Sequence, residues 1–317
     1  MNIQNLIERI EKEKVNAKEE LCNAEGMFRL KSVAEDYNGE YKLVWSDKLL
    51  EEIKQRPKKT LYKTGVPLLD ELIGGFKEQQ LVTLSASTKH GKTAFGLFLM
   101  EKLVDLNPVM IPLEQSNEEI IEQRYDNGYS IPKFLSPEKL ATRVTVDWIE
   151  ERIVEGIAKY NSKFILIDHL GYINDFGNEG EFKRENLAYR IGQIMKGLKN
   201  LAKKWGVIIV LLVHISQKDE SHPPTMEDIK NSSDIAQESD MVIMLWRKNE
   251  QKNKIRIYQN ETLVSVMANR RTGRNGNVGL KFNTTTGQYE EDNAWVKSME
   301  ESAKKEIQAE SDYQGSF

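Results

Sequence analysis

A short polar stretch that follows an apolar segment has the composition and spacing of a phosphate-binding loop. Residues 86–93 read Ala-Ser-Thr-Lys-His-Gly-Lys-Thr, and they come shortly after the apolar segment Leu81–Leu84. In such a loop, successive backbone N–H groups and the N-terminus of the next helix point at phosphate oxygens. We expect Lys92 to reach the β- and γ-phosphates of a nucleotide, and Thr93 to place its hydroxyl on Mg²⁺. The residues predicted to hold the nucleotide are Ser87, Thr88, Lys89, His90, Gly91, Lys92 and Thr93.

The first residue of this loop departs from the usual pattern, which begins with glycine. Ala86 stands there instead. Its Cβ atom is tolerated only if the backbone keeps a negative φ angle. The nucleotide-binding prediction therefore depends on support from residues elsewhere in the chain.

Two other apolar segments end in an acidic residue. Phe164–Ile167 is followed by Asp168, and Met110–Leu113 is followed by Glu114. Ligands of open α/β sheets bind at the carboxyl ends of strands. We therefore expect Asp168 to hold Mg²⁺ beside Thr93, directly or through water. Two interpretations of Glu114 stay open: a base that orients and deprotonates an attacking water, or an acid in an ordinary polar loop.

A histidine follows a fourth apolar segment, Val207–Val213. At the tip of a strand, His214 has the means to sense a γ-phosphate by hydrogen bonding. Histidines that only satisfy local structure are more common, and Gln217 competes for the same role. The sequence alone does not choose between them.

A basic turn follows the apolar segment Leu263–Ala268. Residues 269–276 include Arg270, Arg271, Arg274 and two glycines, which is typical of the tip of a β-hairpin. One of these arginines is a candidate for reaching a phosphate, including a phosphate bound by a neighbouring subunit. The alternative is a solvated basic turn.

Two further loops follow predicted strand tips and are candidates for contact with nucleic acid. They cover residues 175–186 and 217–234, and their basic residues are Lys183, Arg184, Lys218 and Lys230. Neither loop is rich in basic or aromatic residues, and the second also carries acids. Direct phosphate contact is therefore only weakly indicated by composition.

The elements that must position these residues alternate between strands and helices. The predicted strands are Gln80–Ser85, Val109–Leu113, Phe164–Ile167, Val207–Val213, Met241–Trp246 and Leu263–Ala268. Predicted helices between them are Thr93–Val104, Asp147–Lys159 and Arg190–Lys204. Fully apolar strands that alternate with helices indicate an α/β fold with a mainly parallel sheet flanked by helices. A shorter helix is predicted at Ser46–Gln55.

The composition excludes several classes of protein. Of 317 residues, 39% are hydrophobic and 30% are charged, with a net charge of −4. This balance argues against a general nucleic-acid coat but allows a local basic channel. No apolar run is long enough to span a membrane, so no membrane association is expected. The single cysteine, Cys22, excludes a disulfide framework and suits a reducing compartment, so we expect a cytoplasmic protein.

Taken together, these segments resemble a known family. Residues 64–290 are similar to the RecA-like motor domain of DnaB-type hexameric replicative helicases, which implies a RecA-like P-loop NTPase core. The similar segments are TGVPLLDELIGG (64–75), the phosphate loop with Ala94-Phe95, PLEQS (112–116), the strand at 165–170, the helix from 185 to 207, DIKNSSDIAQESD (228–240) and NRRTGRNG (269–276). A phage-encoded origin fits the short N-terminal region, and the host stays open.

The resemblance implies a role for each candidate residue. Glu114 corresponds to the catalytic base, and Asp168 to the Mg²⁺ ligand. His214 falls where most members carry a glutamine that reads the γ-phosphate, and related phage and mitochondrial ring helicases carry histidine there. The arginine that acts on the neighbour's ATP is Arg271 in one alignment and Arg270 in the other. Asn269 falls where the family has a lysine.

The resemblance also implies the partners and the domain organisation. Lys230, Asn231 and Ser233 correspond to the segment that contacts single-stranded DNA in the centre of the ring. A homo-hexamer, ATP, Mg²⁺ and a primase or helicase loader follow from the family. The predicted domains are a helical N-terminal segment with a linker helix (1–60), an ATPase domain (61–292) and a charged C-terminal tail (293–317). The linker helix Ser46–Gln55 is expected to pack on an adjacent subunit.

Two alternatives to a helicase stay open. The first is a RadA- or KaiC-like ATPase of recombination or regulation, because segment 64–75 fits those proteins too. The second is an assembly or loader module that binds nucleotide without unwinding DNA, because Asn269 replaces a lysine and the candidate DNA loops are acidic.

Overall fold

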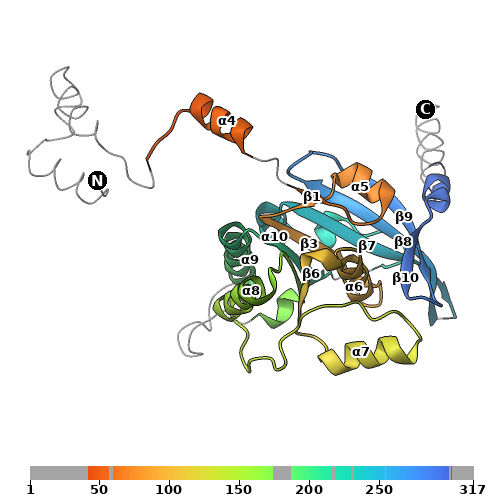
Figure 1. Ribbon diagram of the computed structural model, residues 1–317. Helices are drawn as coiled ribbons and strands as arrows, with labels where there is room; N and C mark the ends of the chain where they lie inside the picture. The colour runs from red at the N-terminus through yellow and green to blue at the C-terminus, as the bar shows by residue number, and fades with distance from the viewer. Residues whose placement is uncertain are drawn as a thin grey trace, which may run out of the picture. The chain divides into compact units, whose positions relative to one another are not determined.

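The structure, a computed structural model, describes residues 42–56, 60–173, 187–215, 219–229, 232–253, 255–299 and 301. Its contacts divide the chain into two units, Met1–Lys58 and Lys59–Phe317. The described part of the first unit holds one helix, α4 (Ser46–Gln55), at the predicted position (Figure 1). Leu49, Leu50 and Ile53 of α4 are exposed apolar side chains.

The second unit is built on an eight-stranded sheet with the order β10-β9-β8-β7-β3-β6-β5-β4. Its strands are β3 (Gln80–Ala86), β4 (Val109–Pro112), β5 (Phe164–Asp168), β6 (Ile208–His214), β7 (Met241–Lys252), β8 (Ile255–Asn269), β9 (Gly276–Asn283) and β10 (Gln288–Glu291). Strands β4, β5, β6, β3 and β7 run parallel, and β8, β9 and β10 continue the sheet antiparallel. A small second sheet pairs β1 (Leu61–Tyr62) with β2 (Phe76–Lys77). The predicted mainly parallel α/β fold is confirmed.

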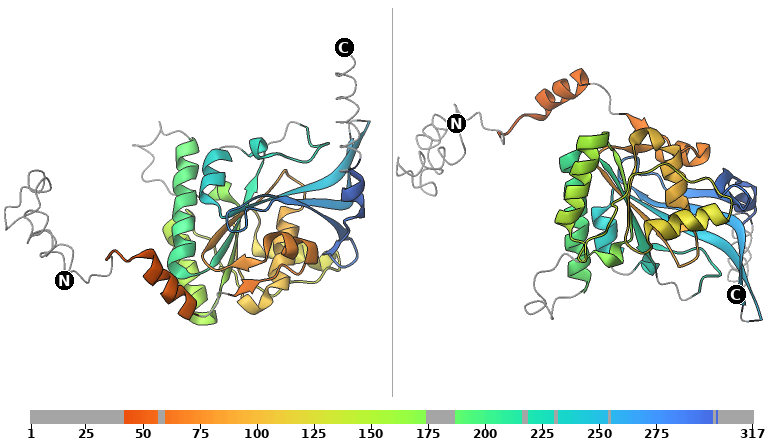
Figure 2. Two further views of the ribbon diagram at one scale, coloured as in Figure 1. Left: turned by 90° about the horizontal axis from the view of Figure 1, so that it is seen from above. Right: turned by 60° about the horizontal axis from the view of Figure 1, so that its bottom comes forward.

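Helices cover both faces of this sheet (Figures 1 and 2). They are α5 (Pro67–Ile73), α6 (Lys92–Lys102), α7 (Asn117–Asp126), α8 (Val146–Tyr160), α9 (Leu187–Trp205) and α10 (Ser232–Glu238), with short 3₁₀ turns η1 (Val104–Leu106), η2 (Leu170–Tyr172) and η3 (Met226–Asp228). Alternate residues of β3 face opposite layers: Val82 belongs to the core cluster that includes Phe95 of α6, whereas Leu81 belongs to the cluster that includes Leu198 of α9. Burial on both faces explains why the parallel strands are apolar throughout.

The parallel arrangement brings several strand ends together at one edge, which we call the carboxyl edge. Ala86 lies opposite His214, and Pro112 lies opposite Asp168. The phosphate loop, Glu114, Asp168 and His214 all lie at this edge. The turn between β8 and β9 lies at the other edge, which we call the amino edge, because β8 runs antiparallel to β7 and pairs Asn269 with Met241.

Two boundaries differ from the sequence prediction. Strands β7 and β8 extend into a long hairpin, and β9 and β10 add strands that the apolar pattern did not indicate. Packing also continues past residue 292, where we expected a charged tail to begin: Val296 is buried against Trp246 and Leu263. None of the described helices combines the length and apolar character that crossing a membrane requires.

Candidate functional site

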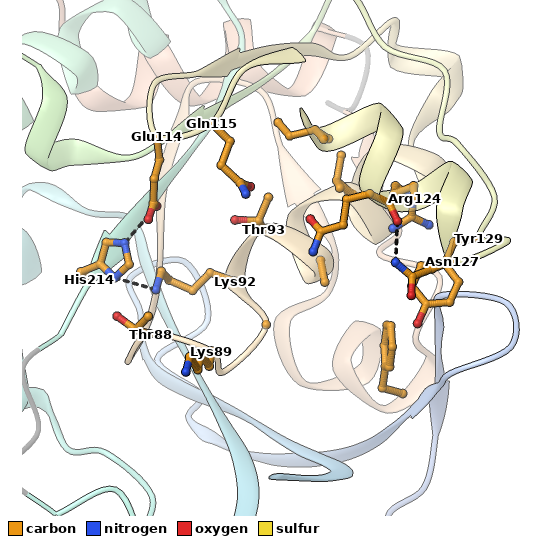
Figure 3. Close-up of a pocket in the computed structure, with 16 residues that line it drawn as sticks. Thr88, Lys89, Lys92, Thr93, Glu114, Gln115, Arg124, Asn127, Tyr129 and His214 are labelled. Carbon is orange, nitrogen blue, oxygen red and sulfur yellow. Dashed lines mark hydrogen bonds and ion pairs between the residues drawn. The ribbon is translucent and has the colours of Figure 1, made fainter. Parts of the chain in front are cut away.

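A cleft of about 480 Å³ opens at the carboxyl edge (Figure 3). Its walls come from the phosphate loop and α6, from the residues after β4, from α7 and the turn that follows it, and from the end of β6. The lining side chains include Thr88, Lys89, Lys92, Thr93, Glu114, Gln115, Gln123, Arg124, Asn127, Tyr129, His214 and Phe282. One end of the cleft is charged, and the other end is lined by flat side chains.

The backbone conformation of the phosphate loop shows that alanine fits at its first position. Lys89 and Gly91 adopt the left-handed conformation, with φ angles of 67° and 85°, whereas Ala86 is not among the positive-φ residues and is fully buried at the end of β3. An alanine is therefore accommodated without backbone strain. Gly91 is the position that requires glycine, because a Cβ atom there would also lie 2.6 Å from the hydroxyl of Tyr289.

Lys92 is buried at the charged end of the cleft. Its Nζ donates to the carbonyl oxygens of Ala86 at 2.9 Å and Ser87 at 3.4 Å, and it lies 3.0 Å from Nδ1 of His214. Burial lowers the pKa of Lys92 to about 8, although the charges of Asp168 and Glu114 oppose that shift. A positive group is thus held beside the loop where phosphate oxygens are expected.

Thr93 and Asp168 meet next to Lys92. The Thr93 hydroxyl donates to Oδ2 of Asp168 at 2.7 Å, and Asp168 is only 2% exposed. Burial raises the pKa of Asp168, against the effect of the Thr93 hydrogen bond. Its second oxygen, Oδ1, is buried without a hydrogen-bond partner among the described residues. A hydroxyl and an unpaired carboxylate oxygen are the hard donors that Mg²⁺ prefers, so this pair fits the ion.

Glu114 lies across the cleft from Lys92 and is reached by two histidines. Nε2 of His214 lies 3.1 Å from Oε2 of Glu114, and Nε2 of His169 lies 3.7 Å from the same oxygen. Burial raises the pKa of Glu114, but the hydrogen bond and the electrostatic effect of His214, with a smaller contribution from His169, outweigh burial and hold that pKa below its usual value. Burial and the neighbouring His214 lower the pKa of His169 to about 4. Glu114 is thus an ionised carboxylate at the charged end of the cleft.

The far end of the cleft is formed by residues that the sequence did not reveal. Arg124 of α7 is 6% exposed, its Nε donates to the carbonyl oxygen of Ser130 at 2.5 Å, and its guanidinium lies over the ring of Tyr129. Asn127 and Phe282 complete this end. Flat, partly polar side chains are suited to stacking against a planar heterocycle while the charged end holds phosphates.

The geometry of this cleft agrees with the family comparison. The model of the DnaB-like helicase C-terminal domain matches residues 62–134 and 129–291. The chain belongs to this family. Its membership favours the helicase interpretation over the RadA- or KaiC-like alternative, because the match includes both the phosphate loop and the basic turn after β8.

Among curated relatives of this DnaB-like chain are two bacterial helicases. The replicative DNA helicase DnaB of Mycoplasma pneumoniae is 26% identical over 267 residues, which is 72% of this chain and 56% of the relative. The replicative DNA helicase DnaC of Bacillus subtilis is 25% identical over 260 residues, or 69% of this chain and 54% of the relative. The chain therefore spans about half the length of the curated relatives it matches.

Two solved structures share the fold. One, described as an ATPase domain, aligns with a TM-score of 0.62 at 20% identity and covers 78% of this chain and 96% of that domain. A DnaB-like replicative helicase, solved in a study of its interactions with primase, aligns with a TM-score of 0.63 at 20% identity, over 90% of this chain and 77% of that structure. These likenesses show that the chain shares the RecA-like fold of these structures.

Two of the predicted nucleotide-binding residues of this DnaB-like chain turn their side chains away from the cleft. Ser87 and His90 are 3% and 1% exposed, and neither lines the cleft. Nδ1 of His90 accepts the backbone N–H of Arg247, and its ring faces Glu220. The nucleotide-binding prediction for Ser87 and His90 is thus confined to their backbone groups, whereas Thr88, Lys89, Lys92 and Thr93 line the cleft.

The two candidate arginines lie at the amino edge and are held differently. Arg271 donates through its guanidinium to the carbonyl oxygens of Ile73 and Gly75. Arg270 is exposed, and its guanidinium makes one long contact, 3.5 Å to the carbonyl oxygen of Ala236. The structure thus brings neither arginine to the cleft of its own chain.

The predicted DNA-contacting residues are mostly beyond the described part of the chain. Lys183, Arg184, Lys230 and Asn231 lie outside the described residues, and so does Gln217. Ser233 lies within α10. The candidate DNA interface therefore stays a prediction.

Proposed function

We propose that this chain is the ATP-hydrolysing motor of a ring-shaped replicative DNA helicase that moves along single-stranded DNA. The observation that carries the proposal is the convergence of Lys92, Thr93, Asp168 and Glu114 around one cleft. Family membership supports the same conclusion. A phosphate-binding lysine, a Mg²⁺ pair and a carboxylate base are the parts that ATP hydrolysis requires.

The residues of the cleft divide the reaction between them. Lys92 binds the β- and γ-phosphate oxygens, and Thr93 with Asp168 holds Mg²⁺, which when bound neutralises charge on those oxygens. Glu114 accepts a proton from a water whose oxygen attacks the γ-phosphorus. The bond to the β–γ bridging oxygen then breaks, and ADP and phosphate leave. His214 contacts both Lys92 and Glu114, so it is placed to sense the γ-phosphate.

The site is completed by a neighbouring subunit. Lys92 and Arg270 lie at opposite edges of the sheet, and the seven residues of β3 alone span roughly 20 Å at about 3.3 Å per residue. Arg270 therefore does not reach the cleft of its own chain. Because Arg271 is bound to its own backbone carbonyls and Arg270 is exposed, we assign Arg270 as the arginine that reaches the neighbour's ATP.

Assembly and partners follow from the same proposal. We propose a homo-hexameric ring in which the apolar face of α4 packs on an adjacent subunit, because that face carries exposed Leu49, Leu50 and Ile53. Residues 230–233 would contact single-stranded DNA. A primase or helicase loader is a further partner, and the cytoplasm of a bacterium or of a phage-infected host is the proposed location.

A module that binds nucleotide without unwinding DNA is the second candidate. It is favoured by Asn269, which replaces a lysine of the family and is only 5% exposed. Its Oδ1 accepts the backbone N–H groups of Arg271 and Thr272, so the side chain has a structural task within the turn.

One set of measurements separates the two candidates. A helicase hydrolyses ATP faster with single-stranded DNA present and unwinds a forked duplex, whereas the module does neither. Glu114→Gln should abolish turnover and leave binding of a fluorescent ADP analogue intact. Absence of DNA stimulation and unwinding in a well-folded oligomer would overturn the helicase proposal, and turnover by Glu114→Gln would show that the base is another residue.

A further inference from the structure

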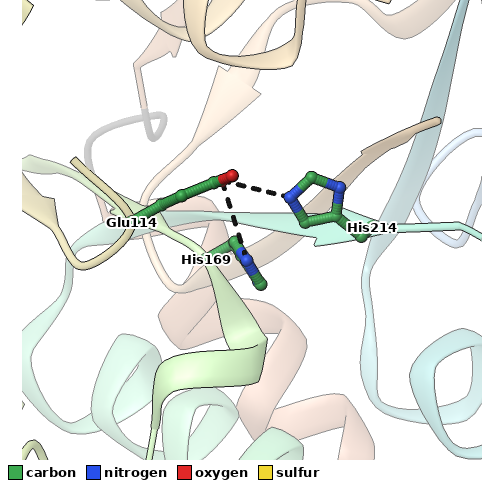
Figure 4. Close-up of side chains that lie close together, drawn as sticks. All are labelled: Glu114, His169 and His214. Carbon is green, nitrogen blue, oxygen red and sulfur yellow. Dashed lines mark hydrogen bonds and ion pairs between the residues drawn. The ribbon is translucent and has the colours of Figure 1, made fainter. Parts of the chain in front are cut away.

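Three side chains from three different strand ends meet at the charged end of the cleft (Figure 4). Glu114 follows β4, His169 follows β5, and His214 ends β6. The two imidazole rings lie 4.2 Å apart, nearly perpendicular to each other. His169 was not among the residues predicted from the sequence, and it is only 14% exposed.

Two imidazoles and a carboxylate this close together are a conceivable ligand set for a transition metal. The hydrogen bonds of the opposite ring nitrogens argue against that use. Nδ1 of His169 accepts the backbone N–H of Gly171 at 3.0 Å, so the ring is neutral and its proton sits on Nε2. A protonated nitrogen cannot ligate a metal, but it can donate to a carboxylate.

His214 is arranged in the same way. Its Nδ1 lies 3.0 Å from Nζ of Lys92, and an ammonium group can only donate. The proton of a neutral His214 ring is therefore also on Nε2, which faces Glu114. Both histidines direct an N–H group at the same carboxylate oxygen, Oε2. The other oxygen, Oε1, is left to take the proton of the attacking water.

We propose that His169 is a positioning residue which, together with His214, holds the Glu114 carboxylate in the orientation that hydrolysis requires. The inference rests on the proposed ATPase function and adds a residue to it. His214 supplies a hydrogen bond at 3.1 Å, and His169 supplies a second polar contact at 3.7 Å from another direction. Two contacts from different strands restrict the rotation of a side chain that one contact leaves free.

The surroundings of His169 fix its own position. Its ring packs edge-on against Tyr172 at a centroid distance of 4.9 Å, and the Gly171 N–H fixes Nδ1. A Cβ atom on Gly171 would lie 2.7 Å from Cε1 of His169, so only glycine leaves space for the ring. Gly171→Ala is therefore a second way to displace the imidazole without changing its chemistry.

The expected consequence is a loss of turnover without a loss of nucleotide binding. Misplacing a catalytic group by about 1 Å costs on the order of 10²-fold in rate, so we expect His169→Ala to lower kcat by about 10- to 100-fold. The KM for ATP and the affinity for a fluorescent ADP analogue should stay within about twofold, because the hydrogen bonds and the ion contact found for His169 among the described residues go to Gly171 and Glu114 rather than to the phosphate loop. Gly171→Ala should also lower kcat, by a smaller factor than His169→Ala.

Rescue separates a positioning role from a structural one. His169→Gln places an amide N–H close to where Nε2 stands, so it should recover most of the lost kcat. The control is His222→Ala, an exposed histidine outside the cleft, which should behave as wild type. The full-length chain is used throughout, with ATPase kinetics, ADP-analogue binding and a thermal melt for each variant.

Three results would overturn the proposal. Wild-type kcat in His169→Ala would show that the second contact is dispensable. An equal loss in His169→Ala and His169→Gln, accompanied by a lower melting temperature, would show a structural role. Tight binding of Zn²⁺ by wild type but not by His169→Ala, in calorimetry, would show a metal site. Absence of ATPase activity in wild type itself would refute the proposed function, which is a separate outcome.

Discussion

The carboxyl edge and the amino edge of the sheet hold their charged side chains in different ways. At the carboxyl edge, Lys92 and Glu114 line a cleft and both contact His214, and Asp168 is hydrogen-bonded to Thr93 beside them. At the amino edge, Arg270 projects into solvent with one long contact. Parallel strands bring their carboxyl ends together, so one edge gathers the reacting groups. The other edge presents Arg270, which we have proposed to act in the cleft of a second copy.

The amino edge is nevertheless well ordered around Arg270. The carboxylate of Asp240 binds Nζ of Lys199 and accepts the backbone N–H of Leu81 at 2.7 Å. The backbone carbonyl of Asp240 accepts the N–H of Arg270 at 2.9 Å. One residue thus links the starts of β3 and β7 to the basic turn, in which the Arg270 side chain stays exposed.

The largest effect, a loss of ATPase activity, is expected when the charged residue of one edge or of the other is removed. Lys92→Ala and Arg270→Ala should each lower ATPase activity by about 10³-fold or more, because each removes a charge that stabilises the transferring phosphate. A mixture of the two variants should regain activity, since some interfaces then combine an intact Lys92 with an intact Arg270. Steady-state ATP hydrolysis after subunit exchange measures this gain.

The matched control uses two changes at the same edge. A mixture of Lys92→Ala and Glu114→Gln should stay inactive. Both residues belong to the same cleft, so every cleft in that mixture carries one of the two changes. If the Lys92→Ala and Arg270→Ala mixture also stays inactive although both variants assemble, the two edges do not share a site.

A change at Asp240 should reduce stability rather than chemistry. Asp240→Ala leaves the ammonium group of Lys199 buried without its partner, which costs roughly 3–5 kcal/mol of unfolding free energy. Urea unfolding of the variant measures the loss, and Asp219→Ala, at an exposed ion pair with His222, is the control that should stay within about 0.5 kcal/mol of wild type. Equal stability of Asp240→Ala and wild type would show that the amino edge is not organised by this residue.

Arg271 should prove structural where Arg270 is functional. Arg271→Ala removes two charged hydrogen bonds to the carbonyl oxygens of Ile73 and Gly75, and we expect a loss of about 2–3 kcal/mol of stability. Its ATPase rate, measured below the unfolding transition, should stay within about threefold of wild type. A fall as large as that of Arg270→Ala would exchange the roles of the two arginines.

The smallest effect is expected at the unusual first residue of the phosphate loop. Ala86→Gly should lower stability by about 0.5–1 kcal/mol, because glycine adds flexibility at the end of a strand that needs no left-handed residue. Nucleotide affinity and kcat should stay unchanged. A gain in kcat would show that the Cβ of Ala86 hinders the loop.

The positions of the candidate reacting groups at the carboxyl edge were predictable because each lies at the end of its own strand in the sequence. Apolar segments locate the strands, and parallel pairing then places Asp168, Glu114 and His214 together. The far end of the cleft was not predictable in this way. Arg124 and Phe282 come from α7 and β9, and only tertiary packing brings them to one wall.

In two short motifs, the roles of adjacent residues could be assigned only from the structure. Arg270 and Arg271 are adjacent in a basic turn, and nothing in the residue types says which guanidinium folds back on its own chain. His169 directly follows the strand-terminal Asp168, which is a usable signal for a second residue at the site. Its meaning depends on the direction of the ring, and that is set by the N–H of Gly171.

The position of Arg270 has a consequence for assembly. If Arg270 of one copy enters the cleft of the next, as proposed, then the amino edge of one copy contacts the carboxyl edge of another. Such head-to-tail contacts either close into a ring or continue as an open row. An open row always ends in one cleft that no arginine reaches, whereas closing the row supplies the missing arginine. Ring closure therefore creates one additional working site, so the turnover measured per chain should itself report whether the assembly is open or closed.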